Sequence, residues 1–179
     1  MNSIKKASAL CALAVTLFVG AQPSVAASTL NDATIFAIFD QANMADIATG
    51  RLGWKKSRTL EVRNLAKMVV TDHSAVQHMG RQLASDLGII GTPPDGDASW
   101  GSQAQALAKL DALSGRAFDE AYLRYEIGYH TAVIGAIKST LLPSIKNPQF
   151  KALVQKVLPG FEKHLTHTKA AADKLGVSY

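Results

Sequence analysis

Residues 91–101 of the chain read GTPPDGDASWG, a stretch that cannot continue a helix. Pro93-Pro94 and Asp95-Gly96 are typical of loops, because proline lacks a backbone N–H group and glycine adopts conformations that other residues avoid. On each side of this stretch the sequence predicts helices. The loop therefore divides the chain into two helical halves, and we expect it to form a longer connection than the links within each half.

Before the loop the sequence predicts two amphipathic helices. The first begins at Asn31 or Asp32, either of which can cap it, and runs to about Lys56; the second begins near Thr59 and ends at Gly88. His73 lies on the apolar face of the second helix. The apolar residues that recur at helical intervals are Ile35, Phe36, Phe39, Ala42, Ile47 and Leu52 in the first helix, and Val62, Leu65, Val69, Val76, Leu83 and Leu87 in the second.

After the loop the sequence predicts a short helix from about Ser102 to Leu113 and two long ones. One long helix runs from Arg116 to about Leu142, and the last helix opens at Asn147-Pro148, a capping side chain followed by proline. Each long helix carries a histidine on its apolar face. The residues of these faces are Leu123, Ile127, His130, Ile134, Ile137 and Leu141, then Phe150, Leu153, Val157, Phe161, His164, Ala171 and Leu175.

The pattern favours an all-α fold, because no segment alternates apolar and polar residues over the length of a strand. Four main helices with short links within each half and one longer crossover predict a ferritin-like up-down four-helix bundle with an extra short helix. About 150 residues are enough to bury one core. We therefore expect residues 28–179 to form a single domain.

Residues 1–27 have the pattern of a cleavable secretory signal peptide. Lys5-Lys6 precede an apolar run over residues 9–20, and small residues at 24–26 offer a cleavage site. The single cysteine, Cys11, lies inside the apolar run and would be removed with it. We therefore expect a periplasmic or secreted protein that is stabilised by packing or by a bound ion rather than by disulfides.

Charge and hydropathy exclude two classes of partner. The formal net charge is +5, and the charged residues are scattered rather than clustered, so no nucleic-acid surface is predicted. No second apolar segment approaches the length of a membrane span, so we expect no membrane insertion after signal cleavage. Partners stay unknown at this point, and an oligomer is compatible with the sequence.

The histidines on the apolar faces suggest a shared site. Burying an imidazole costs free energy unless an interior group accepts its hydrogen bonds or its lone pair, and a metal ion is one such group. Glu126 precedes His130 by one helical turn and shares its face. We therefore predict His73, His130 and His164 as metal ligands, with Glu126 and Asp46 as carboxylate ligands or orienting groups.

Such a set suits one ion of zinc, iron, copper or manganese. It differs from a carboxylate-bridged pair of ions, which requires Glu-x-x-His motifs that this chain lacks. The alternative is an internal polar network that fixes helix register without a ligand. In that case Glu126 could be partly exposed and pair with Arg124 or a neighbouring lysine. We expect Asp72 to face solvent or the flank of its helix, and His78 and His167 to be exposed, although His167 is close enough to His164 to join a site. Tyr122, Tyr125 and Tyr129 are expected to pack their rings without a functional role.

Three blocks of sequence resemble an exported bacterial family, domain of unknown function 4142. They are residues 66–74, AKMVVTDHS; residues 118–122, FDEAY, leading to His130; and Leu158-Pro159 followed by His164-Leu165. The resemblance implies a ferritin-like bundle in the cell envelope, and it places His73, His130 and His164 at matching positions. At position 46, where the family usually has glutamate, this chain has the shorter Asp46.

The sequence specifies no reaction, because it has no phosphate-binding loop, no Gly-x-Ser-x-Gly motif and no His-Glu-x-x-His motif. The leading hypothesis is a metal-associated or stress-related envelope protein rather than a defined enzyme. One alternative is a metal-dependent oxidoreductase that acts on peroxide or oxygen. The other is a non-catalytic interaction protein whose core histidines are structural.

Overall fold

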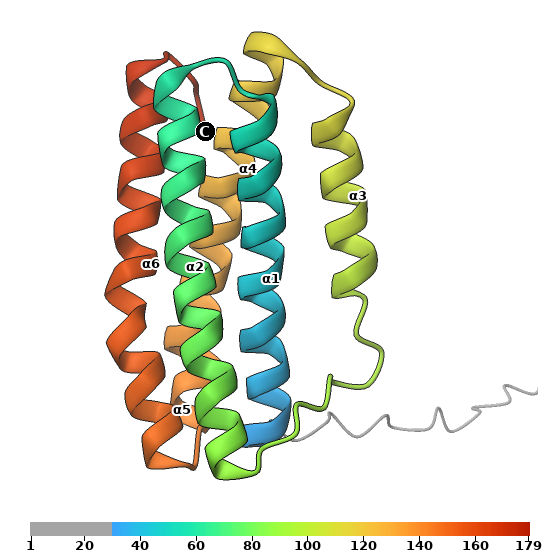
Figure 1. Ribbon diagram of the computed structural model, residues 1–179, viewed down its shortest axis with the longest axis vertical. Coiled ribbons are helices and arrows are strands. Elements are labelled where there is room, and N and C mark those ends of the chain that lie inside the picture. The colour runs from blue at the N-terminus through green and yellow to red at the C-terminus, as the bar shows by residue number, and fades with distance from the viewer. Residues whose placement is uncertain (1–29) are drawn as a thin grey trace, which may run out of the picture.

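The structure, a computed structural model, describes residues 30–179, and their regular secondary structure is entirely helical (Figure 1). The all-α prediction is confirmed. The predicted signal peptide, residues 1–27, lies outside the described residues. The helices are α1 (Asp32–Lys56), α2 (Leu60–Leu87), α3 (Ser99–Asp111), α4 (Gly115–Ala136), the π-helical segment η1 (Ile137–Leu141), α5 (Leu142–Ser144) and α6 (Pro148–Lys174).

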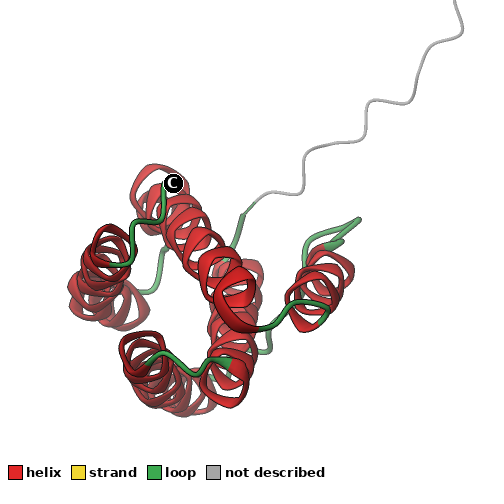
Figure 2. Ribbon diagram, turned by 90° about the horizontal axis from the view of Figure 1, so that it is seen from above, coloured by secondary structure: helices red, strands yellow, loops and turns green. Residues whose placement is uncertain are grey.

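Four long helices, α1, α2, α4 and α6, lie side by side around one interior (Figures 1 and 2). The chain runs upward in α1, downward in α2, upward in α3, downward in α4 and upward in α6 (Figure 1). Each long helix is therefore antiparallel to the two neighbours that it contacts. Helix α3 lies outside the four, against α1 and α4, and returns the chain along the length of the molecule between the two halves.

The predicted helix ends are found where the capping residues place them. The side-chain oxygen of Asn31 accepts a hydrogen bond from the Thr34 N–H group (2.9 Å), and that of Asn147 accepts from the Phe150 N–H group (3.0 Å). Gly88, at φ 66°, ends α2 in the left-handed conformation that glycine adopts without steric cost. Local sequence therefore fixes one end of each of three long helices.

Two boundaries differ from the prediction. Helix α3 begins at Ser99 rather than near Ser102, because the Asp97 carboxylate accepts a hydrogen bond from the Ser99 N–H group (3.0 Å) and starts the helix earlier. The helix predicted from Arg116 to Leu142 is not α-helical throughout, since it passes into the π-helical segment η1 at Ile137. A π turn holds one more residue than an α turn, and apolar periodicity does not reveal it.

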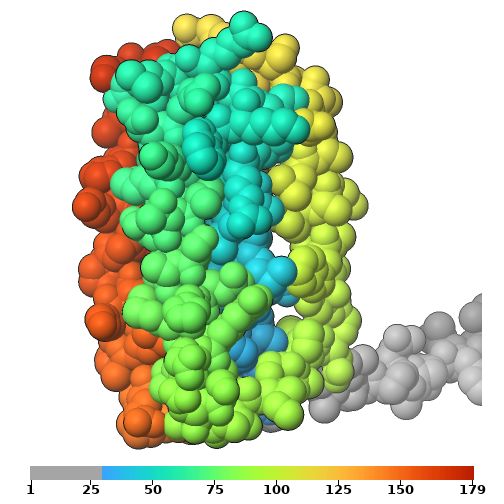
Figure 3. Space-filling model, viewed as in Figure 1, coloured from blue at the N-terminus to red at the C-terminus, as the bar shows by residue number. Residues whose placement is uncertain are grey.

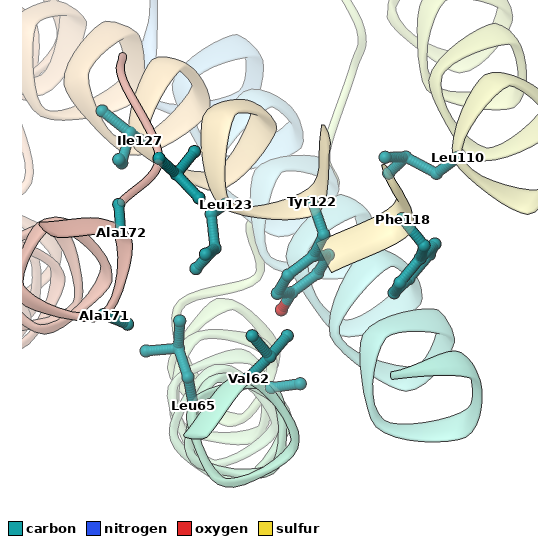
Figure 4. Packing of buried hydrophobic residues seen from close by; sticks show 11 residues of the cluster. Val62, Leu65, Leu110, Phe118, Tyr122, Leu123, Ile127, Ala171 and Ala172 are labelled. Atoms are coloured by element: carbon teal, nitrogen blue, oxygen red, sulfur yellow. The ribbon is translucent and has the colours of Figure 1, made fainter. Parts of the chain in front are cut away.

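Apolar side chains form two clusters, one toward each end of the molecule. The upper cluster gathers around Phe118, Tyr122 and Leu123, and Figure 4 shows the Tyr122 ring beside Val62. The lower cluster consists of Ile35, Phe39, Val76, Ile134, Ile137, Ile145, Phe150, Val154, Val157 and Phe161. Along each long helix, the residues between these clusters include buried polar side chains. The interior is therefore apolar at both ends and polar in the middle.

A methyl group added at Gly53 is expected to destabilise the fold. A Cβ atom there would lie 2.7 Å from the Tyr122 ring and 3.1 Å from the Ala66 Cβ atom. Overpacking of this kind costs about 1–3 kcal/mol, so Gly53→Ala should lower the free energy of unfolding in urea by that amount. The matched control is Gly128→Ala, at an exposed position with open space, which should gain about 0.5–1 kcal/mol. Equal stability of the two variants would contradict the packing.

Candidate metal centre

Each of the four long helices contributes a side chain to the polar middle layer. Asp46 comes from α1, His73 from α2, Glu126 and His130 from α4, and His164 from α6. None of these five residues is more than 4% exposed. The structure therefore brings together every residue that the sequence singled out for a metal site.

The ligand atoms of four of these residues lie close together. His73 Nε2 is 3.1 Å from Asp46 Oδ2 and 3.2 Å from His164 Nδ1, and His130 Nε2 is 3.6 Å from Asp46 Oδ2. One ring nitrogen from each histidine lies within 4.8 Å of the other two. Metal–ligand bonds of about 2.0–2.1 Å at tetrahedral angles place neighbouring ligand atoms roughly 3.3 Å apart. The three histidines form one such group, and Asp46, Glu126 and His130 form a second, so that His130 belongs to both. Each group fits the ligands of a single ion.

A hydrogen bond on the outer side of the His73 ring, away from the other histidines, determines which ring nitrogen directs its lone pair toward the centre. The Asn43 side-chain amide donates to the Phe39 carbonyl oxygen (2.8 Å), which orients the Asn43 Oδ1 atom toward His73. His73 Nδ1 then donates to that oxygen (2.9 Å). Because a neutral imidazole carries one proton, His73 Nε2 is left without a hydrogen and faces Asp46 and His164.

The other two histidines are arranged in the same way. His130 Nδ1 donates to the Glu126 backbone carbonyl oxygen (3.0 Å), and His164 Nε2 donates to Asp72 Oδ2 (2.9 Å). His130 Nε2 has no hydrogen-bond partner among the described residues. Three nitrogen lone pairs are therefore directed toward the interior, where Asp46 also lies. Histidines that bind metals almost always donate their second N–H group to an outer acceptor of this kind.

Burial keeps the histidines neutral, which is the form that binds a metal. Burial, assisted by the nearby His164 and His130, lowers the pKa of His73 to about 2, and burial lowers the pKa of His130 to about 4. The pKa of His164 is also lowered, again chiefly by burial. At neutral pH the three imidazoles therefore carry lone pairs rather than positive charges.

The two carboxyl groups respond to burial in the opposite direction. Burial raises the pKa of Glu126 to about 7, and burial together with the Glu126 carboxylate raises the pKa of Asp46 well above its ordinary value. With neutral imidazoles around them, the two carboxyl groups have no cationic side chain close by, so burial favours their protonated, uncharged form. A bound metal ion would favour the charged carboxylate instead.

Several polar atoms beside Asp46 lack partners. Asp46 Oδ1, both carboxylate oxygens of Glu126 and the Tyr122 hydroxyl group are buried without a hydrogen bond among the described residues. Leaving a buried polar group unsatisfied costs about 1–3 kcal/mol. A polar network that only fixed helix register would be expected to satisfy its members. Against the larger effect of burial, hydrogen bonding with the Thr49, Asp46 and Tyr122 side chains lowers the pKa of Glu126, so these neighbours satisfy part of the network. The remaining unpaired atoms are compatible with a ligand at Asp46.

Two residues of the site were not recognised from the sequence. Asn43 lies one helical turn before Asp46 on the same face of α1, and this spacing is the only signal that could have identified it. Asp72 was expected to face solvent or the flank of its helix, and its side chain is 53% exposed, but its carboxylate also accepts the His164 hydrogen bond. A residue at the edge of the buried face can be exposed to solvent and still accept a hydrogen bond from a buried side chain.

The remaining candidates lie outside the centre. His78 and His167 are exposed, as expected. Glu126 does not pair with Arg124, which binds Glu120 instead (3.3 Å). The Tyr125 hydroxyl donates to a Gln103 side-chain oxygen (3.0 Å), and the Tyr129 hydroxyl donates to the Ala42 carbonyl oxygen (3.1 Å). The hydroxyl groups of these two tyrosines therefore have structural partners.

Comparison with solved structures shows the fold alone. The chain is similar to the crystal structure of a candidate secreted protein of the DUF305 family from Streptomyces coelicolor, with a TM-score of 0.66 and 14% sequence identity. The match covers 82% of this chain and 94% of that chain. Among the described helices, none combines the length and apolarity that crossing a membrane requires.

Comparison with protein families identifies the chain more closely. No curated protein matches it in sequence. Residues 18–171 match the family model described as domain of unknown function (DUF4142), and the matched region includes all five candidate ligands. The resemblance seen in the three sequence blocks is thereby confirmed, and the chain belongs to the DUF4142 family.

Proposed function

We propose that this protein binds one transition-metal ion in the polar layer between its four long helices. The ligands would be His73 Nε2, His130 Nε2, His164 Nδ1 and Asp46 Oδ2. The observation that supports this most strongly is the hydrogen bonding of the three imidazoles, each of which donates its N–H group outward and directs its lone pair inward. Lone pairs that face one another repel, and a cation between them removes the repulsion.

The donor set limits the identity of the ion. Imidazole nitrogens suit zinc, copper and iron, and a carboxylate oxygen extends the range to manganese. Glu126 would assist through charge, because its Oε2 atom lies 3.5 Å from His130 Nδ1 and adds negative charge beside the ligands. The shorter side chain of Asp46 is compatible with this role, since its Oδ2 atom is already 3.1 Å from His73 Nε2.

The finer features of the fold and its location belong to the same proposal. The antiparallel order of the long helices, with α3 as the crossover, supports a ferritin-like four-helix bundle. The similarity to a candidate secreted protein supports export, with residues 1–27 as a signal peptide and residues 28–179 as one domain. The protein would then act as a metal-associated or stress-related component of the periplasm.

Elemental analysis tests the proposal directly. Metal-free protein would be incubated separately with zinc, copper, iron(II) and manganese, and then dialysed. We expect about one tightly held ion per chain for at least one of these metals, and loss of that ion in His130→Gln. The matched control is His78→Gln, which removes an exposed histidine from α2 and should keep the ion. Absence of stoichiometric metal in the wild type, or its retention in His130→Gln, would contradict the proposal.

Asn43→Ala should weaken metal binding without removing a ligand. The change deletes the acceptor that holds the proton on His73 Nδ1, so the ring loses its fixed orientation. Loss of such an outer partner typically costs 10–100-fold in metal affinity. Competition with a chromophoric chelator measures this change. Asn64→Ala, at an exposed position of α2, is the control, and equal affinity of the two variants would show that Asn43 does not orient the ring.

A further inference from the structure

A small cavity, with the exposed Ala136 in its wall, borders the candidate metal centre. Its volume is about 70 Å³, and its wall includes Asn43, Asp46 and His73. The rest of the wall is apolar and comes chiefly from α1, α4, η1 and α6, with Phe161 on the α6 side. A molecule in this cavity would lie beside Asp46 and His73, although their polar atoms form almost none of its surface.

The π-helical segment forms part of this cavity. Ile137 and Leu141, the first and last residues of η1, both belong to its wall. A π turn interrupts the regular placement of side chains along a helix, and such interruptions are frequent at functional sites. The departure of η1 from α-helical geometry therefore coincides with the apolar side of the candidate centre.

A surface groove adjoins this cavity. A groove of about 510 Å³ lies between α1, α3 and α4, and it shares Ile38, Ala42 and Val133 with the cavity wall. Seen end-on, α3 stands to one side of the four long helices (Figure 2), and the space-filling view shows hollows between α1 and α3 (Figure 3). The three shared residues are apolar and border both spaces, and we call them the partition.

We infer that the cavity binds a small, neutral, apolar molecule of the size of dioxygen and holds it against Asp46 and His73. This inference names the ligand class of the proposed metal site and rests on that proposal. It is supported by the position of the cavity, by its apolar wall and by the groove that adjoins it.

The size and polarity of the cavity select among ligands. Pockets for organic substrates usually measure about 300–1,000 Å³, so a cavity of about 70 Å³ is too small for them. Apolar cavities stay dry and bind apolar guests such as xenon. Peroxide must lose its hydrogen bonds to water to enter such a space, whereas dioxygen has almost none to lose. The cavity therefore favours dioxygen over peroxide.

Xenon under pressure is a direct probe of the cavity, and it requires no metal. Crystals of the metal-free protein exposed to xenon should show an anomalous peak between Ile137, Leu141 and His73. In solution, dissolved dioxygen should relax the methyl protons of Ile137 and Val133 more strongly than those of Leu123, which is buried in the upper apolar cluster. No xenon peak, or equal relaxation of the three residues, would overturn the inference.

A filling variant connects the probe to this cavity. Ala42→Leu places a larger side chain in the partition and should abolish the xenon peak while leaving the metal content unchanged. The control is Ala48→Leu, also on α1, which borders the grooves next to α3 but not the cavity. If the wild-type protein binds metal but neither xenon nor dioxygen, only this inference is refuted. If the wild-type protein binds xenon but no metal, the proposed metal site is refuted.

Discussion

Metal binding should raise the melting temperature of the metal-free protein by about 10 °C. An ion that binds only the folded chain, at a free concentration about 1,000 times its Kd, stabilises that chain by about 4 kcal/mol. For a domain of this size each kcal/mol shifts Tm by about 2–4 °C. The four proposed ligands come from four different helices, so the ion would hold the whole assembly together.

Ligand variants separate this effect from non-specific binding. His164→Gln removes one lone pair from the centre and should abolish most of the shift, whereas His167→Gln, one turn away and exposed, should preserve it. Differential scanning calorimetry with and without a chelator measures both. A shift of equal size in His164→Gln would show that the stabilising ion binds elsewhere.

Acid should destabilise the metal-free protein through its buried histidines. The pKa of His130 falls to about 4 and that of His73 to about 2 in the folded state, against an ordinary value of 6.5. Below pH 6.5 the unfolded chain therefore binds protons that the folded chain does not. The stability that each histidine contributes is complete above pH 6.5 and declines by about 3 kcal/mol by pH 4.

Glu126 should produce the opposite dependence. Its pKa rises from 4.5 to about 7 on folding, so the folded chain holds a proton that the unfolded chain releases between these values. The contribution of Glu126 is present below pH 4.5 and is lost as the pH rises through 7. Relative to the wild type, Glu126→Gln should therefore gain stability as the pH rises from 4.5 to 7.

Urea unfolding of the metal-free proteins between pH 4 and 8 measures both dependences. Relative to the wild type, His130→Gln should gain stability as the pH falls, and Glu126→Gln should gain it as the pH rises. The opposite signs control for a general effect of mutation in the core. If the free energy of unfolding of each variant differed from that of the wild type by the same amount at every pH, the burial of these groups would be contradicted.

Much of the fold follows from local sequence. Apolar residues at helical intervals predicted the four long helices, and the caps at Asn31, Gly88 and Asn147 predicted where three of them begin or end. The loop from Gly91 indicated the division into two halves. What the sequence did not show is that α3, rather than the loop alone, spans the distance between them, because that depends on packing against α1 and α4.

The candidate site was predicted only in part, because some of its features show in local sequence and others depend on contacts between helices. A histidine on an apolar helical face can be recognised from periodicity, so His73, His130 and His164 were found. Hydrogen bonds between helices leave no such pattern, so the roles of Asn43 and Asp72 emerged only from the structure. The π-helical segment was missed because its one-residue shift is invisible in a list of apolar positions.

The position of the bound ion tests the central claim most directly. Crystals of the metal-loaded protein, measured at the absorption edge of the metal, should give one strong anomalous peak in the polar layer. We predict that it lies about 2.0–2.1 Å from His73 Nε2, His130 Nε2 and His164 Nδ1 and in contact with Asp46. A peak at the exposed His78 or His167 instead, or no peak in protein that was offered each of the four metals, would contradict the account.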